Sequence, residues 1–201
     1  MQIDKRKTSS AKPVVERNTV MPEQPTLFTE RIILRPYALN DAKELQRLIG
    51  DRAIADTTTN IPHPYEDGMA EEWISRRQET FERGVSVQFA ITHREQGFFM
   101  GGIGLMIDRE HERAEVGYWI GEPYWNQGYC TEAARAVLKY GFEVLKLNRI
   151  HANHFKRNPA SGRVMQKIGM KHEGSLRQHV KRWGQFEDCE TCGILRSEYT
   201  V

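Results

Sequence analysis

The feature that most constrains this chain is a glycine-containing loop within Tyr124–Ala133, which leads from an extended apolar stretch directly into a periodic helix. Backbone N–H groups in the first turn of a helix have no partner inside the helix, and the aligned peptide dipoles add partial positive charge there. Such a helix end binds anions without basic side chains, and Gly128 allows the backbone to approach a phosphate closely. The loop therefore predicts a pyrophosphate site, although a purely structural turn fits the same short pattern.

The residues on either side of the loop support this order of strand, loop and helix. Residues 115–120 are rich in β-formers and read as a strand. After the loop, apolar residues recur at helical spacing on one face and charged residues occupy the other face. The apolar face consists of Ala134, Val137, Leu138, Gly141, Phe142 and Leu145.

The loop resembles the acyl-CoA-binding motif of the GNAT acetyltransferase superfamily, in which Gln or Arg is followed by two residues, Gly, one residue, and Gly or Ala. Here the motif aligns with Trp125–Cys130, so that Trp stands at its first position and Cys at its last. The Trp is typical of the branch that resembles ribosomal-protein N-terminal acetyltransferases, in which a tyrosine–tryptophan pair commonly precedes this loop. The Cys is small enough not to block the approach of the backbone to a ligand.

Two further segments resemble the same superfamily, in the same order along the chain. Residues 158–170 are similar to its Asn…Ser…Lys-hydrophobic-Gly-hydrophobic motif, and Asn158 suits a helix N-cap, Pro159 the first turn and Gly169 the C′ position. Residues 173–177 and 184–188 resemble the closing β-hairpin of the ribosomal-protein branch. The three motifs together extend over about residues 27–201 and are far more specific than any one of them.

The composition excludes several classes of protein. The 201 residues are 39% hydrophobic and 28% charged, which fits one globular domain, and no apolar run approaches the length of a membrane span. The net charge of +2 gives the chain no general attraction to nucleic acid. The cysteine count of three is odd, and the N-terminus lacks the apolar core of a signal peptide. We therefore expect a cytoplasmic protein without structural disulfides.

The predicted elements describe a mixed α/β sheet. Residues 1–25 contain prolines and basic residues without apolar periodicity, which predicts a flexible tail before one domain at 26–201. Early strands, one crossover helix and a final hairpin favour a mixed sheet over a doubly wound one. The resemblance implies the GNAT fold: a central, mostly antiparallel, twisted sheet flanked by helices, with a C-terminal β-hairpin. The expected elements are strands at 27–35, 85–93, 98–107, 113–120 and 149–154, helices from Asn40 or Asp41 to Gly50 and at 69–81, and a loop at 53–67.

Two side chains are candidates for acid–base chemistry in a reaction of the GNAT type. An acceptor amine must lose a proton before it attacks a thioester, and the resemblance places Glu115 where some members keep a general-base glutamate. Glu112 is a weaker alternative, and Glu115 could equally be a solvent-facing strand carboxylate. Many members protonate the departing thiolate with a tyrosine, but the matching residue here is Met165. Ser161 matches a serine that the ribosomal-protein branch uses near the CoA sulfur, and its structural alternative is a serine that bonds the helix start.

The cosubstrate implied by the resemblance is acetyl-CoA. Backbone groups near Trp119 and Ile120 are expected to pair with its pantetheine arm as an added strand would, and Asn158 to bond that arm from the other side. The pyrophosphate is expected at the backbone of the loop, which comprises Gln127, Gly128, Tyr129, Cys130 and Thr131.

We expect no metal, because Cys189 and Cys192 are three residues apart in an extended segment and point to opposite faces. The expected function is direct transfer of an acetyl group to an amine, most simply the N-terminal α-amine of a ribosomal or other protein. A small amine, such as an aminoglycoside or polyamine, is an alternative that an excess of carboxylates at 53–67 would favour. A non-catalytic acyl-CoA-sensing or RNA-associated module is a second alternative, suggested by Met165 and by the basic residues of 177–182. Membrane and direct nucleic-acid partners are not expected, and both a monomer and a homodimer remain open.

Overall fold

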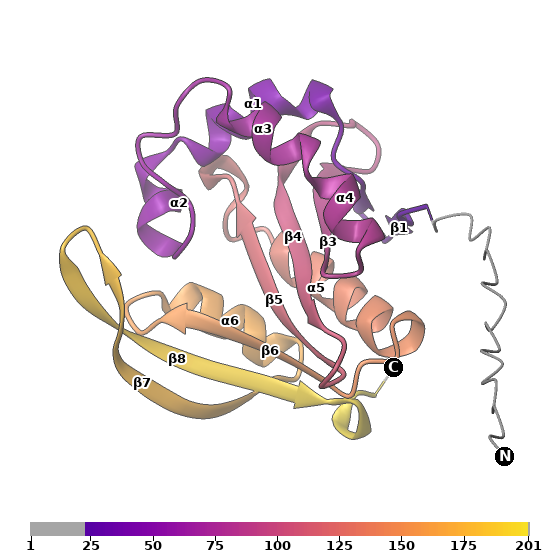
Figure 1. Cartoon of the computed structure of the whole chain (residues 1–201), viewed down its shortest axis with the longest axis vertical. Coiled ribbons are helices and arrows are strands. Elements are labelled where there is room, and N and C mark those ends of the chain that lie inside the picture. Colours follow the sequence, from indigo (N-terminus) through magenta and orange to yellow (C-terminus); the bar gives the residue numbers. More distant parts are fainter. Residues whose placement is uncertain (1–22, 201) are drawn as a thin grey trace, which may run out of the picture.

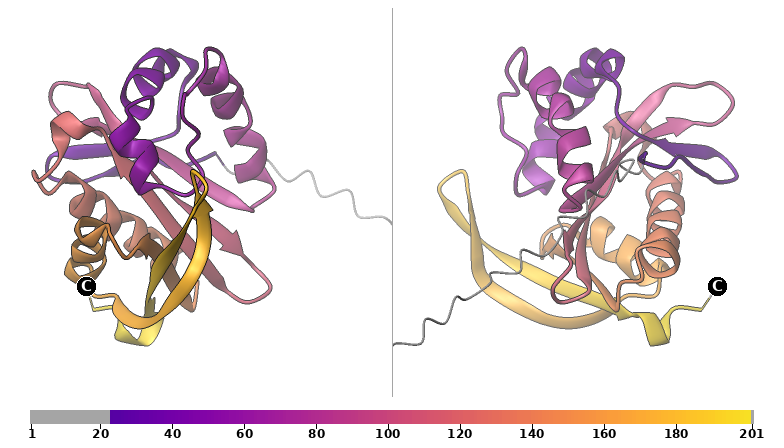
Figure 2. Two further views of the ribbon diagram at one scale, coloured as in Figure 1. Left: turned by 90° about the vertical axis from the view of Figure 1, so that its left-hand side faces the viewer. Right: turned by 45° about the vertical axis from the view of Figure 1, so that its right-hand side comes forward.

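The computed structural model describes residues 23–200, which form one eight-stranded sheet with helices on both faces (Figures 1 and 2). The strand order is β1-β2-β3-β4-β5-β6-β8-β7. Neighbouring strands are antiparallel except for β5 and β6, which are parallel. The strands are β1 (Leu27–Phe28), β2 (Ile32–Arg35), β3 (Ser86–His93), β4 (Phe99–Asp108), β5 (Arg113–Ile120), β6 (Arg149–Phe155), β7 (Lys171–Arg182) and β8 (Gln185–Leu195).

The helices fall into two groups on opposite faces of the sheet, which the right-hand view of Figure 2 separates clearly. The first group is α1 (Ala42–Ile49), α2 (Arg52–Thr57), α3 (Met69–Ser75) and α4 (Arg77–Glu82). The second group is α5 (Tyr129–Lys139), which continues into a π-helical turn at Tyr140–Val144, and α6 (Pro159–Lys167). Short 3-10 turns lie at Leu39–Asp41, Glu122–Tyr124 and Arg196–Glu198.

Each face of the sheet has its own hydrophobic core. The larger core joins β2–β6 to α5 and α6, and the smaller core joins β3 and β4 to α1, α2 and α3. Because successive strand residues point to opposite faces, β5 presents Val116 and Tyr118 to the larger core. The same strand turns Glu115, Gly117 and Trp119 toward α1–α4. Strand β5 therefore contributes side chains to both halves of the molecule.

The sheet opens between β5 and β6. These strands pair only where Arg113–Glu115 lies beside Arg149–His151. Beyond that point β5 continues along β4 as far as Ile120, whereas β6 follows β8 along its whole length. Figure 1 shows β6, β8 and β7 diverging from β5 below the helices α1–α4. One edge of β5, from Val116 onward, therefore has no strand beside it among the described residues.

The fold class predicted from the sequence is confirmed, and so are the closing hairpin and the four strands expected between residues 85 and 154, to within one or two residues at their ends. Two early segments differ from the prediction. The strand expected at 27–35 is interrupted by a tight turn, in which the Thr29 backbone N–H donates to the Ile32 carbonyl at 3.0 Å. The loop expected at 53–67 begins inside α2, because the Asp51 side chain caps that helix by accepting from the Ala53 N–H at 2.8 Å.

The helix expected at 69–81 is two helices. Arg76 lies between them with φ −86° and ψ −6°, close to the bridge region. The Ser75 hydroxyl accompanies this break by donating to the carbonyl of Glu72 at 2.8 Å. After the division, α3 packs against α1 and α4 packs against β3.

The predicted tail at 1–25 lies mostly outside the described residues. Gln24, near its end, is buried and donates its side-chain amide to the carbonyl of Gln88 at 2.8 Å. Within residues 23–200, no helix has both the length and the apolar character to cross a membrane. Over the same range, no group of three or more His, Cys, Asp or Glu residues is arranged to hold a metal ion.

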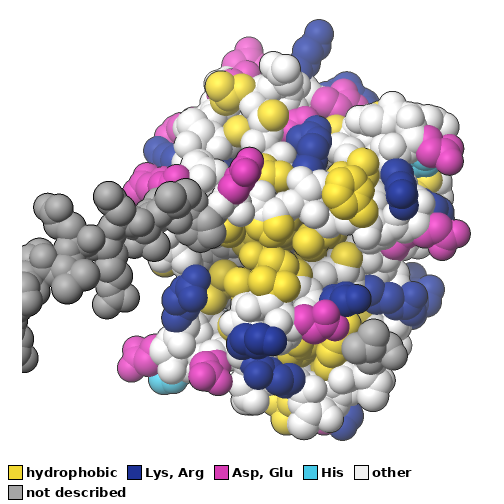
Figure 3. Space-filling view, turned by 90° about the vertical axis from the view of Figure 1, so that its right-hand side faces the viewer, with side chains coloured by type: hydrophobic (Ala, Val, Ile, Leu, Met, Phe, Trp, Pro, Cys, Tyr) yellow, Lys and Arg dark blue, Asp and Glu magenta, His cyan; other side chains and the backbone are white. Residues whose placement is uncertain are grey.

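The side of the molecule that carries β1 has a mixed surface. Hydrophobic side chains gather near its centre, and Lys, Arg, Asp and Glu side chains surround them (Figure 3). Apolar atoms contribute more than half of the surface of ordinary folded proteins. We therefore assign no site to this face.

Candidate functional site

A cavity of about 1210 Å³ opens where β5 and β6 separate. It extends from the N-terminus of α5, past the first turn of α6, to α1, α3 and the segment 57–62. This volume exceeds the ~300–1,000 Å³ of a typical small-ligand pocket, so it has room for two substrates that meet. The predicted site residues that line it are Glu115, Trp119, Ile120, Gly128, Tyr129, Cys130, Thr131, Asn158 and Ser161, and Gln127 is the one that does not.

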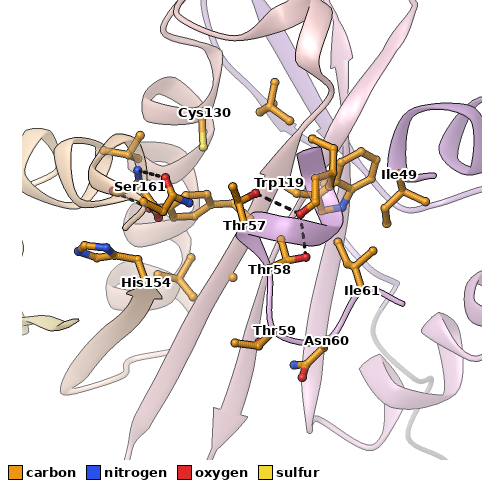
Figure 4. A pocket seen from close by; sticks show the side chains of 18 of the residues that line it. Ile49, Thr57, Thr58, Thr59, Asn60, Ile61, Trp119, Cys130, His154 and Ser161 are labelled. Carbon is orange, nitrogen blue, oxygen red and sulfur yellow. Dashed lines mark hydrogen bonds between the residues drawn. The ribbon is translucent and has the colours of Figure 1, made fainter. Parts of the chain in front are cut away.

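Figure 4 shows how the cavity is arranged. Ser161, Cys130 and His154 lie on the side of α5 and α6, and Trp119, Ile49 and Ile61 lie on the other side. The segment from Thr57 to Asn60 crosses the view between them. The cavity therefore spans both halves of the molecule.

The N-terminus of α5 faces this cavity. Gly128 is its N-cap, with φ 84° and ψ −5°, a left-handed conformation that glycine adopts without steric cost. Asn126, two residues earlier, also has a positive φ of 59°. No side chain of the described residues caps the first-turn N–H groups of α5. These N–H groups and the helix dipole thus remain available for an anion.

Arg31, from the turn between β1 and β2, braces this helix start. Its guanidinium donates to the Gln127 carbonyl at 3.0 Å, pairs with Glu132 at 2.8 Å, and lies 4.7 Å from the centroid of the Tyr129 ring. Although partial burial opposes ionisation, hydrogen bonds from Thr29 and Arg31 lower the pKa of Glu132 below its usual value. The carboxylate is therefore neutralised locally and does not repel an anion at the neighbouring backbone.

Two side chains of the loop serve the structure of the loop itself. The Gln127 amide donates to the Pro123 carbonyl at 3.0 Å, which explains why this side chain is outside the cavity. The Trp125 indole donates to the Ile120 carbonyl at 2.6 Å and so ties the loop to the end of β5.

Burial raises the pKa of the Cys130 thiol to about 12, so this group is a neutral small side chain near pH 7.

The first turn of α6 brings Ser161 against Tyr118. The Tyr118 hydroxyl lies 2.9 Å from Ser161 Oγ and 3.1 Å from the Ser161 carbonyl oxygen. Burial raises the pKa of Tyr118, which keeps the phenol protonated at neutral pH. The Asn158 side chain caps α6 by accepting from the Ser161 N–H at 3.3 Å, as expected for this position. Met165, where the resemblance implies a tyrosine, is buried in the larger core.

Glu115 is held by a chain of hydrogen bonds across the mouth of the split. Its Oε1 accepts from the Asn153 side-chain amide at 3.1 Å, and Asn153 Oδ1 accepts from the Thr191 hydroxyl at 2.8 Å. His151 is the partner of Glu115 in the β5–β6 register, and burial lowers its pKa. Glu115 and His151 also line a second, smaller cavity of about 330 Å³. The carboxylate of Glu115 thus lies between the two cavities with one oxygen fixed.

The far wall of the main cavity is closed by the hairpin β7–β8. At its tip, the Arg182 guanidinium donates to the carbonyls of Ala55 at 2.5 Å and Ile61 at 2.6 Å. Arg157 pairs with Asp56 at 3.0 Å and with Glu187 at 2.9 Å. The basic residues of 177–182 therefore include one whose charge is used inside the fold, which weakens the argument for an RNA-binding surface.

Sequence reasoning missed three residues of this site: Arg31, Tyr118 and Asn153. Arg31 lies far from the loop in sequence and carries no motif. Tyr118 had a detectable feature, because alternation along β5 places its hydroxyl on an apolar face, where it needs a hydrogen-bond partner. The role of Asn153 depends on where β5 and β6 separate, and no local sequence pattern predicts that position.

The comparisons with known proteins agree with this geometry. The acetyltransferase (GNAT) domain family matches residues 31–171. The uncharacterized N-acetyltransferase p20 of Bacillus licheniformis is 34% identical over 176 residues, covering 87% of this chain and 98% of its own length. A Bacillus subtilis protein provisionally described as the ribosomal N-acetyltransferase YdaF is 28% identical over 178 residues, covering 85% of this chain and 94% of its own.

A solved structure shares the fold. It is the spermidine N-acetyltransferase of Vibrio cholerae in complex with CoA and spermine, with a TM-score of 0.73 and 22% identity over 84% of this chain and 97% of that one. The open edge of β5, the uncapped start of α5 and the cavity that joins them are what an acyl-CoA would require. With the family match over residues 31–171, they lead to one conclusion: the chain belongs to the GNAT family and is an acetyl-CoA-dependent N-acetyltransferase.

Proposed function

We propose that the protein transfers an acetyl group from acetyl-CoA to the N-terminal α-amine of a peptide or protein. The observation that carries this proposal is the shortage of negative charge around the acceptor. Among the described residues that line the main cavity, Glu72 and Glu115 are the only carboxylates, and Glu72 is paired with Arg76. A polyamine or aminoglycoside carries several positive charges and needs more acidic partners than these.

The carboxylates that would have favoured a small polycation lie elsewhere. Asp56 is paired with Arg157, Asp67 accepts a hydrogen bond from Gln46 at 2.6 Å, and Glu66 is exposed. None of the three acidic residues lines the cavity. An acceptor with a single reacting amine fits the remaining charge, with Glu115 as its partner.

The cosubstrate is expected to bind through backbone groups. The first-turn N–H groups of Gly128–Thr131 suit the pyrophosphate, and the open edge of β5 suits the amides of the pantetheine arm. The Ile120 carbonyl already accepts from Trp125, so Gly117–Trp119 is the stretch best placed for that pairing. The Asn158 amide lines the cavity on the opposite side and is expected to bond the same arm.

The chain's own residues supply the proton transfers. Glu115 takes the proton of the acceptor ammonium, and the second cavity beside His151 gives that proton a path away from the site. The neutral amine nitrogen then attacks the thioester carbon, so a C–N bond forms and the C–S bond breaks. Ser161 donates its hydroxyl proton to the departing thiolate and recovers one from Tyr118, which is reprotonated from solvent. General acid–base groups of this kind typically contribute ~10²–10⁴-fold.

The chemistry of amines also favours an α-amine over a lysine side chain. An α-amine has a pKa near ~8 and a lysine near ~10.4, so deprotonating the lysine at neutral pH costs roughly 3 kcal/mol more. A single carboxylate base held by one amide handles the first amine much more easily than the second. The other carboxylate among the described residues that line the cavity is Glu72. It is paired with Arg76 and is therefore a poor second base.

A competition experiment tests the proposal. The enzyme is incubated with acetyl-CoA and a peptide that carries a free N-terminus and an internal lysine, with spermidine and an aminoglycoside in parallel reactions. Mass mapping is expected to place the acetyl group on the α-amine. Preferential acetylation of lysine, or turnover of spermidine or the aminoglycoside alone, contradicts the assignment.

A further inference from the structure

The acceptor half of the cavity contains an open space above the middle of β5. Gly117 is exposed although it lies in a central strand, and a Cβ built on it would meet no atom within 4 Å. Neighbouring glycines of β4 on the same face are different. A Cβ on Gly102 would collide with the Tyr37 hydroxyl, and one on Gly104 would collide with the Gln88 side chain. The space over Gly117 is thus the part of this face that the protein leaves unfilled.

Aromatic side chains line the part of the cavity that faces α1–α4. Trp119 follows two residues later on the same face of β5, and Tyr37, Tyr65 and Trp73 line the cavity from the side of α1–α4. They are fixed by the smaller core, against which all four pack. The rings of Tyr37 and Trp73 meet edge to face, with centroids 4.8 Å apart. The walls are therefore preformed and do not need to order on binding.

The polar side chains next to the Tyr37 and Trp73 rings are either neutral or held by a neighbour. Burial raises the pKa of the Tyr37 hydroxyl, which keeps it neutral. The Arg77 guanidinium lies 4.3 Å from the centroid of the Trp73 ring and donates to the Trp73 carbonyl at 2.9 Å. Glu115, two residues before Gly117 on the same face, is the charged group nearest along the strand. The space thus has aromatic rings in the walls of its cavity, and the Glu115 carboxylate and the Gln88 side chain lie at its border.

We propose that this space binds the side chain of the first residue of the acceptor, and that this side chain is large and apolar, with phenylalanine as its best representative. The inference rests on the proposed function, and it extends that function to a specificity. With the α-amine at Glu115, the adjoining side chain of an N-terminal residue enters the region over Gly117 and contacts Trp119, the next residue on the same face. Burial of a phenylalanine ring instead of an alanine methyl is expected to favour the phenylalanine peptide by about 10- to 100-fold in kcat/KM.

Two peptides that differ only at the first residue, Phe or Ala, test this specificity. Each has a free N-terminus and an internal lysine, and CoA release is followed together with the position of the acetyl group. The phenylalanine peptide is expected to react faster by the stated factor. Equal rates, or a faster alanine peptide, overturn the hydrophobic subsite and leave the proposed function intact. Acetylation of spermidine but of neither peptide overturns the proposed function, and the subsite with it.

The variant Gly117→Val separates the subsite from a general preference for hydrophobic peptides. The backbone at Gly117 is outside the left-handed region and valine suits a strand, so the variant should fold, which circular dichroism checks. Its side chain enters the open space and is expected to reduce the Phe/Ala ratio of kcat/KM by at least about tenfold. Gly174→Val is the matched control, because Gly174 is also a strand glycine with no atom within 4 Å of its Cβ position, on β7. A folded Gly117→Val enzyme with an unchanged ratio, or an equal change in Gly174→Val, contradicts the inference.

Discussion

The two sides of the cavity are built by different means. On the side of α5, the proposed binding groups are backbone N–H groups at the start of one helix and along the open edge of one strand, and their positions follow from Gly128 and from the end of the β5–β6 pairing. On the side of α1–α4, the wall is made of side chains from separate elements, such as Tyr37 and Trp119. The first side suits a cosubstrate common to a whole family, and the second can change with the acceptor while the fold is kept.

The largest expected effect concerns the residue between the two sides. Glu115→Gln keeps the shape of the side chain but removes the proposed base, so turnover should fall ~10²–10⁴-fold, chiefly at low pH where the amine most needs deprotonation. A pH profile of kcat for wild type and variant measures this. A loss below about threefold across the profile would make Glu115 a structural carboxylate.

Ser161→Ala should lower kcat over the whole pH range, because the departing thiolate needs a proton whatever the state of the amine. Tyr118→Phe should lower kcat by a smaller factor, with the same pH dependence. The variant removes the phenol that lies 2.9 Å from Ser161 Oγ but keeps the Ser161 hydroxyl. Single-turnover kinetics separate this step from product release. A Ser161→Ala enzyme with wild-type kcat, or with a loss confined to low pH, would leave Ser161 as a structural partner of the Tyr118 hydroxyl and not as the acid.

Gly128→Val sharpens the comparison from the cosubstrate side. Valine at φ 84° is strained, and its Cβ would lie 3.4 Å from the Arg31 guanidinium. We expect CoA to bind about 10- to 100-fold more weakly. Calorimetry measures this change, and each factor of ten in Kd corresponds to ~1.4 kcal/mol of binding free energy. An unchanged CoA affinity in a folded variant would contradict binding of the pyrophosphate by the first-turn N–H groups of α5.

The smallest effect is expected at the ion pair between Arg31 and Glu132, beside the start of α5. The pKa of Glu132 is lowered in the folded state, so its ionised form contributes stability above the unfolded pKa of ~4.3 and loses it as the pH falls through the folded pKa. Glu132→Gln should therefore destabilise the protein at pH 7 by less than about 1 kcal/mol, since Arg31 is partly exposed, and by less still near pH 3. Urea unfolding at both pH values measures the difference. An equal loss of stability at both pH values would show that the effect of Glu132→Gln comes from packing and not from the charge of Glu132.

The contrast between the two sides also explains what the sequence could predict. The start of α5, the Asn158 cap and the turn at Gly169 depend on a few consecutive residues, and their positions follow from local conformational preferences. The contacts of Arg31 and Asn153 depend on which strands become neighbours. Local periodicity also cannot foresee that a continuous apolar pattern divides at Arg76. The acceptor wall, assembled almost entirely from such distant contacts, was accordingly the part that the sequence left open.

Hydrogen–deuterium exchange with CoA alone is the most direct test of the central claim, that backbone groups hold the cosubstrate on one side of β5 while the other side is kept for the acceptor. Slower exchange is expected at residues 116–120 and 128–133 on addition of CoA, with no change in α1–α4 at 42–82. Protection confined to 42–82, or none at 128–133 under saturating CoA, would contradict it.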